Sequence, residues 1–192
     1  MRNPYGWFRR DHPRVGPGAL TSSPADATYH RRVADDESPA FQDLYPEHLA
    51  HCYGCGRLNE HGYHIRTHWD GEESVTRFTP APFHTAVPGL VYGGLLASLV
   101  DCHSTGTAAA ALYRADGRAM DDPAAAPHRC VTGTLTVRFA HPTPLGPELE
   151  IRGVVTEVRG RKVTVASRVL VNGVATVDAE AICLDLPGSF AS

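Results

Sequence analysis

The chain has 192 residues, 42 % of them apolar and 20 % charged, with a formal net charge of −3. This length fits one domain of about 100–200 residues, and the composition is that of a globular chain rather than a disordered one. Nucleic-acid binding is disfavoured because no basic excess is present. The longest weakly polar run, residues 88–100, is shorter than the roughly 18–20 residues that cross a bilayer. We therefore expect a globular domain with neither nucleic acid nor a membrane as partner.

The first part of the chain differs from the rest in charge and in its content of chain-breaking residues. Residues 1–33 hold six arginines against two aspartates, and prolines and glycines interrupt any periodic pattern. We expect residues 1–37 to form an N-terminal arm, partly disordered or docked on a partner subunit, before a single domain at residues 38–192. The arm lacks the apolar run of a signal peptide, and five scattered cysteines fit reduced thiols, so we expect a cytoplasmic protein.

Most of the domain shows the two-residue period of β-strands. Residues 38–50 first predict a short helix. Two strands then follow, joined by Asp70-Gly71, and the last two strands flank Asn172-Gly173, a dipeptide typical of tight hairpins. The predicted strands are residues 64–69, 74–78, 131–139, 148–158, 162–171 and 174–184. In the third of them apolar residues alternate with threonines and an arginine, which predicts one apolar and one polar face, with Thr132 on the polar face. An antiparallel meander is expected.

One long helix is predicted from Gly93 to about Tyr113. Its apolar face carries Leu95, Leu96, Leu99, His103, Gly106 and Ala110, and its small, polar face carries Gly94, Ala97, Ser98, Asp101, Ser104, Thr105 and Ala108. Aspartate has a poor helix propensity, so a single carboxylate among small residues in mid-helix indicates a functional role. The alternative is an acid that bonds a neighbouring hydroxyl or arginine across a subunit contact.

A glycine pair, Gly93-Gly94, opens this helix after a segment that includes Gly89. Unpaired N–H groups and the positive end of the helix dipole can hold developing negative charge there, although glycine pairs also serve tight turns. Gly93 and Asp101 are eight residues apart, about 12 Å along the helix axis, so one carbonyl cannot contact both within one helix. If both act on it, the aspartate comes from an antiparallel copy of the helix, which predicts a two-fold dimer.

These features together resemble the hotdog-fold acyl-CoA thioesterases of the PaaI-like group. The resemblance covers residues 50–186 and includes the helix with its Gly-Gly start and its aspartate, the strands around residues 131–137 and 159–162, and a Cys-aromatic-Gly-Cys-Gly stretch at residues 52–56. It implies an α+β hotdog fold, in which an antiparallel sheet wraps around one long central helix. It also implies a homodimer or a dimer of dimers.

The resemblance further implies a thioesterase that hydrolyses an acyl-CoA or acyl-carrier thioester at the dimer interface, without a cofactor. The backbone N–H of Gly93 or Gly94 would hold the thioester carbonyl, and Asp101 would act as general base or as nucleophile. Thr132 would orient the water or the acid. Arg159, Arg161 and Lys162 stand where the family meets the phosphates of CoA; a solvated cationic turn is the alternative for these three.

Two positions depart from the family pattern. Tyr92 replaces the histidine that commonly precedes the glycine pair; it can donate one hydrogen bond but carries no positive charge near neutral pH. Ala86 replaces an asparagine or glutamine, and the nearby His84 could take over its role in binding substrate. These departures favour, as an alternative, a non-catalytic acyl-CoA-binding or biosynthetic accessory protein. A hotdog hydratase is less favoured, since no Asp/His pair is placed for it.

Cys52 and Cys55 have the spacing of half a zinc knuckle. Five histidines lie within the same stretch of sequence: His48, His51, His61, His64 and His68. We predict no metal site, because no second cysteine pair lies near in the sequence and the matching segment of the family is not regarded as one. His103 lies two residues from Asp101 and points away from it, which indicates a core histidine.

Overall fold

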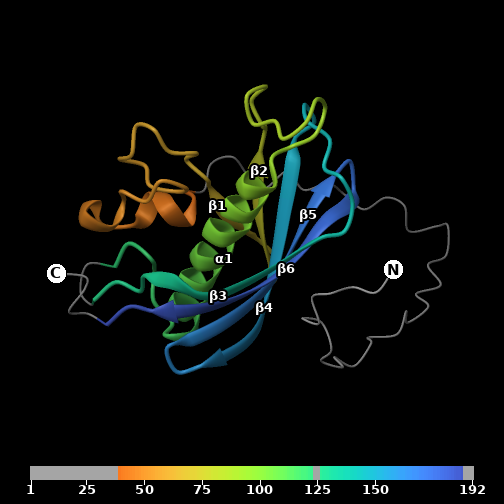
Figure 1. The fold of residues 1–192 in the computed structure, drawn as a ribbon. Coiled ribbons are helices and arrows are strands. Elements are labelled where there is room, and N and C mark those ends of the chain that lie inside the picture. Colours follow the sequence, from red (N-terminus) through yellow and green to blue (C-terminus); the bar gives the residue numbers. More distant parts are fainter. Residues whose placement is uncertain (1–38, 123–125, 188–192) are drawn as a thin grey trace, which may run out of the picture. The chain divides into compact units, whose positions relative to one another are not determined.

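A computed structural model describes residues 39–122 and 126–187, so the predicted N-terminal arm lies outside the described residues. One six-stranded sheet holds β1 (Thr67–Asp70), β2 (Glu73–Phe78), β3 (Cys130–Phe139), β4 (Leu149–Arg159), β5 (Lys162–Val171) and β6 (Val174–Asp185). The strand order is β1-β2-β4-β5-β6-β3, and every neighbouring pair is antiparallel. Helix α1 (Gly93–Ala115) packs against this sheet (Figure 1). The predicted antiparallel sheet with one long helix is confirmed, but the predicted meander is not, because β3 pairs with β6 rather than with β4.

The segment before the first strand differs from the prediction. In place of the one helix predicted at residues 38–50, the described residues 39–50 form two short 3-10 turns, η1 (Phe41–Leu44) and η2 (Glu47–Leu49). Pro46 separates them, because a proline disfavours helical backbone in the residue before it, and Tyr45 is extended with φ −68° and ψ 139°. The first strand likewise begins at Thr67 rather than at His64, whose φ of +51° is incompatible with a strand.

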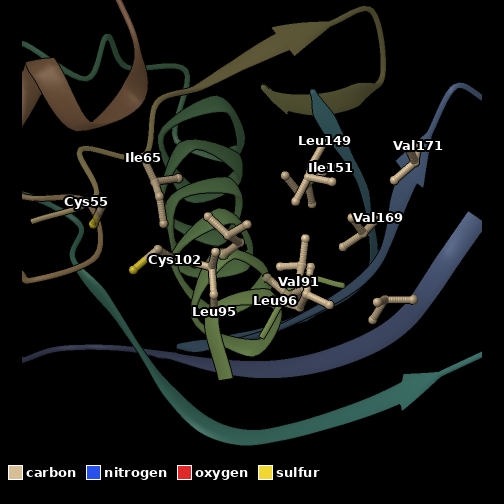
Figure 2. Packing of buried hydrophobic residues seen from close by; sticks show 13 residues of the cluster. Cys55, Ile65, Val91, Leu95, Leu96, Cys102, Leu149, Ile151, Val169 and Val171 are labelled. Carbon is tan, nitrogen blue, oxygen red and sulfur yellow. The ribbon is translucent and has the colours of Figure 1, made fainter. Parts of the chain in front are cut away.

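Two hydrophobic clusters hold the helix against the sheet. In the N-terminal half of α1, Leu95, Leu96 and Leu99 pack with residues of β4, β5 and β6 such as Ile151 and Val169 (Figure 2). Toward the C-terminal end, the second cluster is built from Ala108, Ala109, Leu112, Val163, Val165 and Ala181. Each fully buried leucine or valine contributes about 1.5–3 kcal/mol, so the helix is fixed along its whole length.

The burial of the small helix face differs from the prediction in its second half. Four of its residues are half-buried, which fits a helix face that is partly open to solvent: Gly94, Ala97, Ser98 and Asp101. Residues 102–110, by contrast, are buried all round, including the predicted polar positions. Ser104, for example, bonds through its Oγ to the Oγ of Ser167 on β5 at 3.1 Å. The open part of the face is therefore confined to the first two turns and Asp101.

Strand β3 contains a β-bulge that the alternating sequence pattern does not show. Thr132 pairs with Cys183 and Thr134 pairs with the next residue of β6, Ile182, so Gly133 is the extra residue. A Cβ at Gly133 would lie 3.1 Å from Leu184 Cδ1, which favours glycine there. The bulge places Thr132 on the same face as the buried Cys183, toward α1. The predicted placement of Thr132 beside Thr134 on the polar face is wrong for this reason.

His103 is a core histidine, as predicted. Its Nδ1 bonds Thr76 Oγ1 at 2.9 Å and its Nε2 bonds Ser74 Oγ at 3.0 Å, so both ring nitrogens are satisfied inside the protein. Burial lowers the pKa of His103 to about 3, which keeps the ring neutral. Gly153 makes room for it, because a Cβ there would lie 2.5 Å from Nε2.

Candidate active site

Asp101 and Thr132 meet between the helix and the sheet. The Thr132 hydroxyl on β3 donates a hydrogen bond to Asp101 Oδ1. Cys183 on β6 is the register partner of Thr132, and its burial and then the charge of Asp101 raise the pKa of its thiol to about 12. The half-buried Asp101 therefore keeps access to solvent while one oxygen is fixed by the hydroxyl. The structure thus brings together two residues that were singled out on separate grounds.

The N-terminus of α1 offers backbone donors. The Tyr92 carbonyl accepts the N–H groups of Leu95 at 3.1 Å and Leu96 at 3.3 Å. The N–H groups of Gly93 and Gly94 precede these, and the first N–H groups of a helix have no acceptor within it. The Tyr92 ring lies over Gly94, since a Cβ at Gly94 would be 2.4 Å from Tyr92 Oη. Both amides therefore lie at the start of the helix, next to the exposed phenol ring of Tyr92.

A cavity of about 360 Å³ opens beside Gly93. Leu96 and Phe139 give it apolar walls, and His141 and Thr143 supply polar groups. Ala86 lies in its lining, at the position where the resembled family places a polar amide. Neither Phe139 nor His141 was singled out from the sequence, because the strand pattern assigns no function to the residues that end a strand. The cavity can hold a small or apolar group next to the helix amides.

His84 and Gly89 shape the loop that leads into the helix. The His84 carbonyl accepts the N–H of Tyr92 at 2.9 Å, and its Nδ1 accepts the N–H of Ala81 at 3.0 Å. In the neutral ring the proton is therefore on Nε2. Gly89 has a φ of +84° and its carbonyl accepts the N–H of Leu145 at 2.9 Å, so a turn accounts for the glycine. His84 thus lies beside the helix start, whereas Gly89 supports the loop.

The three cations of the β4–β5 hairpin are not equivalent. Arg159 pairs with Glu157 at 2.9 Å. The Arg161 guanidinium donates twice to the Asp185 carbonyl, at 2.9 and 2.6 Å, and thereby ties the hairpin to the end of β6. Lys162 forms no ion pair within the described part of the chain, and its register partner Leu184 places it on the sheet face away from Asp101. Lys162 is the cation that remains available for an anion.

A cluster of three thiols lies on another side of α1. The Sγ atoms of Cys52, Cys55 and Cys102 are all within 4.8 Å of one another, and all five cysteines of the chain are free. Cys102 follows Asp101 directly on the helix and is 47 residues from Cys55 in the sequence. Sequence spacing alone therefore could not associate it with the other two.

Comparison with known proteins identifies the family. A sequence profile described as the thioesterase superfamily matches residues 88–176. The crystal structure of a thioesterase superfamily protein from Shewanella loihica PV-4 is 39 % identical, with a TM-score of 0.54 over 67 % of this chain and 96 % of that one. The chain belongs to the thioesterase superfamily.

Two further matches show how far the likeness extends. The acyl-coenzyme A thioesterase THEM4 of Xenopus laevis is 35 % identical over 89 residues, which are 46 % of this chain and 33 % of that protein. The chain thus matches about a third of the length of this curated relative. A Streptococcus mutans protein, solved bound to acetyl CoA, is 13 % identical with a TM-score of 0.51 over 64 % of this chain and 88 % of that one. This last match shows a shared fold and nothing more. The fold of the present chain, an antiparallel sheet with one long helix, is the hotdog fold.

Among the described residues, no helix is both long enough and apolar enough for a membrane span.

Proposed function

We propose that this protein hydrolyses an acyl-CoA or acyl-carrier thioester to a carboxylic acid and a free thiol. The observation that carries the proposal is the hydroxyl-bonded carboxylate of Asp101 on the same helix that begins with the Gly93 and Gly94 amides beside a cavity. Membership of the thioesterase superfamily and the similarity to an acyl-coenzyme A thioesterase support it.

In the proposed reaction, the amides of Gly93 and Gly94 donate to the thioester carbonyl and stabilise the oxyanion as the carbonyl carbon becomes tetrahedral. Asp101 takes a proton from the attacking water, or attacks the carbon itself and forms an anhydride that water then cleaves. The carbon–sulfur bond breaks, and the thiolate leaves and takes up a proton. The hydrogen bond from Thr132 fixes the carboxylate, so that its other oxygen can face the water.

The site is proposed to be shared by two subunits. The helix amides and Asp101 are separated by about 12 Å along one helix, which is too far for both to act on one carbon. A second helix can pack closely against the half-buried small residues of this helix face, which are Gly94, Ala97 and Ser98, next to Asp101. Strand β3 ends the sheet order, with Phe139 53 % exposed, and leaves an edge that a second copy can cover. A two-fold dimer would contain two such sites.

Coenzyme A is the proposed thiol carrier. THEM4 is named an acyl-coenzyme A thioesterase, and the Streptococcus mutans protein of the same fold was solved with acetyl CoA. Lys162 is the candidate for a contact with the CoA phosphates, with Arg159 beside it on the same hairpin. The cavity next to Gly93 is the candidate for the acyl group.

A panel of acyl-CoA esters with a thiol-detecting readout tests this function, with wild type compared to Asp101→Asn. Asparagine keeps an oxygen for the Thr132 hydroxyl but cannot take a proton, so kcat/KM should fall roughly 100-fold or more while the fold is retained. A variant that keeps more than about a tenth of wild-type kcat/KM would show that Asp101 is not the base or nucleophile.

The second candidate is a protein that binds acyl-CoA without hydrolysing it. The observation that favours it is the exposed Tyr92 ring, which covers Gly94 in place of the family's histidine. Binding of every ester in the panel without thiol release by the wild-type protein would support this candidate. Hydration of an enoyl-CoA in the same panel would instead indicate a hydratase, although Asp101 is bonded here to a threonine rather than a histidine.

A further inference from the structure

The loop that carries Cys52 and Cys55 turns tightly and brings their two sulfur atoms close together. The Gly56 N–H donates to the Cys52 carbonyl at 2.7 Å, which closes the turn that carries the two cysteines. A Cβ at Gly56 would lie 2.5 Å from Cys52 N and from Ala50 O, so only glycine lets the loop close this tightly. The loop thus presents two cysteine sulfurs on one side of a narrow turn.

Helix α1 supplies the third sulfur. A Cβ at Gly54 would lie 2.3 Å from Cys102 Sγ, so this glycine clears the space that the helix thiol occupies. Cys52 Sγ and Cys102 Sγ are 3.8 Å apart, and Cys55 and Cys102 point toward the same space between the loop and the helix (Figure 2). Gly56 therefore lets the loop close, and Gly54 leaves the space in which the Cys102 thiol of the helix joins the two loop thiols in one cluster.

We propose that Cys52, Cys55 and Cys102 bind a thiophilic metal ion of the Zn²⁺ class, which fastens this loop to helix α1 beside Asp101. A zinc–sulfur bond is about 2.3 Å, so two sulfurs on a tetrahedral zinc lie about 3.8 Å apart. The separation of the Cys52 and Cys102 sulfurs has this value, whereas a disulfide would require about 2.05 Å. The site does not depend on the proposed hydrolysis.

The surroundings fit the charge of such a complex. Three thiolates with one divalent cation carry a net charge of −1, and a charge buried this way needs a partner. Arg129 is the candidate partner: its guanidinium lies 4.8 Å from the Tyr45 ring and within electrostatic range of all three cysteines. The Tyr45 hydroxyl is buried with no hydrogen-bond partner among the described residues, and it also lies within electrostatic range of Cys55 and Cys102.

Cys52 is the one member of the cluster that is half-buried rather than buried, so the fourth coordination position is expected to be a water reached from its side.

Titration of Co²⁺ into the reduced, chelator-treated full chain tests the site, because thiolate ligands give Co²⁺ a charge-transfer absorption. Wild type should saturate at one equivalent, Zn²⁺ should abolish the absorption, and Zn²⁺ should raise the Tm. Cys52→Ser, at the half-buried position, should weaken binding by more than the roughly 10–100-fold that loss of an outer-shell partner costs. Cys130→Ser is the control, since Cys130 is a buried free cysteine outside the cluster, and it should titrate like wild type.

Three outcomes would overturn the proposal. The first is the absence of a charge-transfer band in reduced wild type. The second is a band that Cys52→Ser and Cys130→Ser change equally. The third is a chain that does not bind Co²⁺ but loses two free thiols on exposure to air. Such a chain would form a disulfide within the cluster, which would then be a redox pair and not a metal site. Thioester hydrolysis is measured separately: loss of activity in Asp101→Asn with normal Co²⁺ binding would leave this site standing.

Discussion

At the scale of residues, the account depends on one carboxylate and the hydroxyl that holds it. An aspartate in mid-helix among small residues already indicated a role, but its partner became evident only in the structure. The contact between Thr132 and Asp101 orients one carboxylate oxygen, and the Asp101 side chain as a whole is half-buried. The resulting expectation is that removal of the hydroxyl affects the reaction more than the fold.

Thr132→Val tests this, because valine keeps the shape and deletes the hydrogen bond. A hydrogen bond to a charged group contributes about 1.5–3 kcal/mol, so kcat/KM should fall roughly 10–100-fold with little change in Tm. Thr134→Val is the matched control, since Thr134 lies beyond the bulge and is exposed. Equal kinetics for the two variants would show that the Thr132 hydroxyl does not serve Asp101.

The buried His103 predicts a pH dependence of stability. Its pKa is about 3 in the folded protein and about 6.5 in the unfolded chain, so the unfolded state binds the proton more readily. The stability is therefore fully present above about pH 6.5 and is lost as the pH falls toward 3. Between about pH 7.5 and about pH 5, His103 should lower the free energy of unfolding by roughly 2 kcal/mol.

Urea unfolding of wild type and His103→Gln at both pH values measures this contribution. Glutamine can still bond Ser74 or Thr76 but does not titrate, so the difference in stability between the two proteins should shrink at the lower pH. A difference that stays constant between the two pH values would contradict a neutral, buried imidazole.

At the scale of elements, the β4–β5 hairpin carries two cations with different expected roles. Arg161 is a structural cation, whereas Lys162 has no ion-pair partner among the described residues. Arg161→Ala should lower the free energy of unfolding by about 1 kcal/mol, because its two hydrogen bonds to the Asp185 carbonyl hold the end of β6. Lys162→Ala should leave stability unchanged and raise KM about threefold for CoA esters but not for short pantetheine esters, which lack the nucleotide phosphates. Equal KM changes for both substrates would make Lys162 a solvated surface charge.

The elements also show what the sequence could predict. Six strands and one long helix follow from the two-residue and 3.6-residue periods, and the Gly-Gly start and Asp101 follow from residues that are unusual for their positions. The bulge at Gly133 does not follow, because it reverses the side-chain direction without changing the apolar pattern. The burial of Ser104 likewise depends on Ser167, a distant residue on β5. Cys102 joined the thiol cluster for the same reason, through a long-range contact.

At the scale of the whole molecule, a second copy of the chain is the remaining requirement of the proposed reaction. A half-buried helix surface of small residues and the free edge of β3 are the surfaces that a two-fold partner can cover. A dimer should therefore be the smallest species in sedimentation at working concentrations. A monomer with full thioesterase activity would rule out a site built from two helices.

The most direct measurement is complementation between two inactive variants. Asp101→Ala keeps the helix amides, and Gly94→Trp keeps Asp101 while its side chain blocks the amides. After subunit exchange in an equal mixture, half of the dimers are mixed, and each mixed dimer has one site with both defects and one intact site. Activity should recover to about a quarter of wild type. If subunits exchange and the mixture stays as inactive as its parents, the amides and the carboxylate do not meet across a two-fold axis.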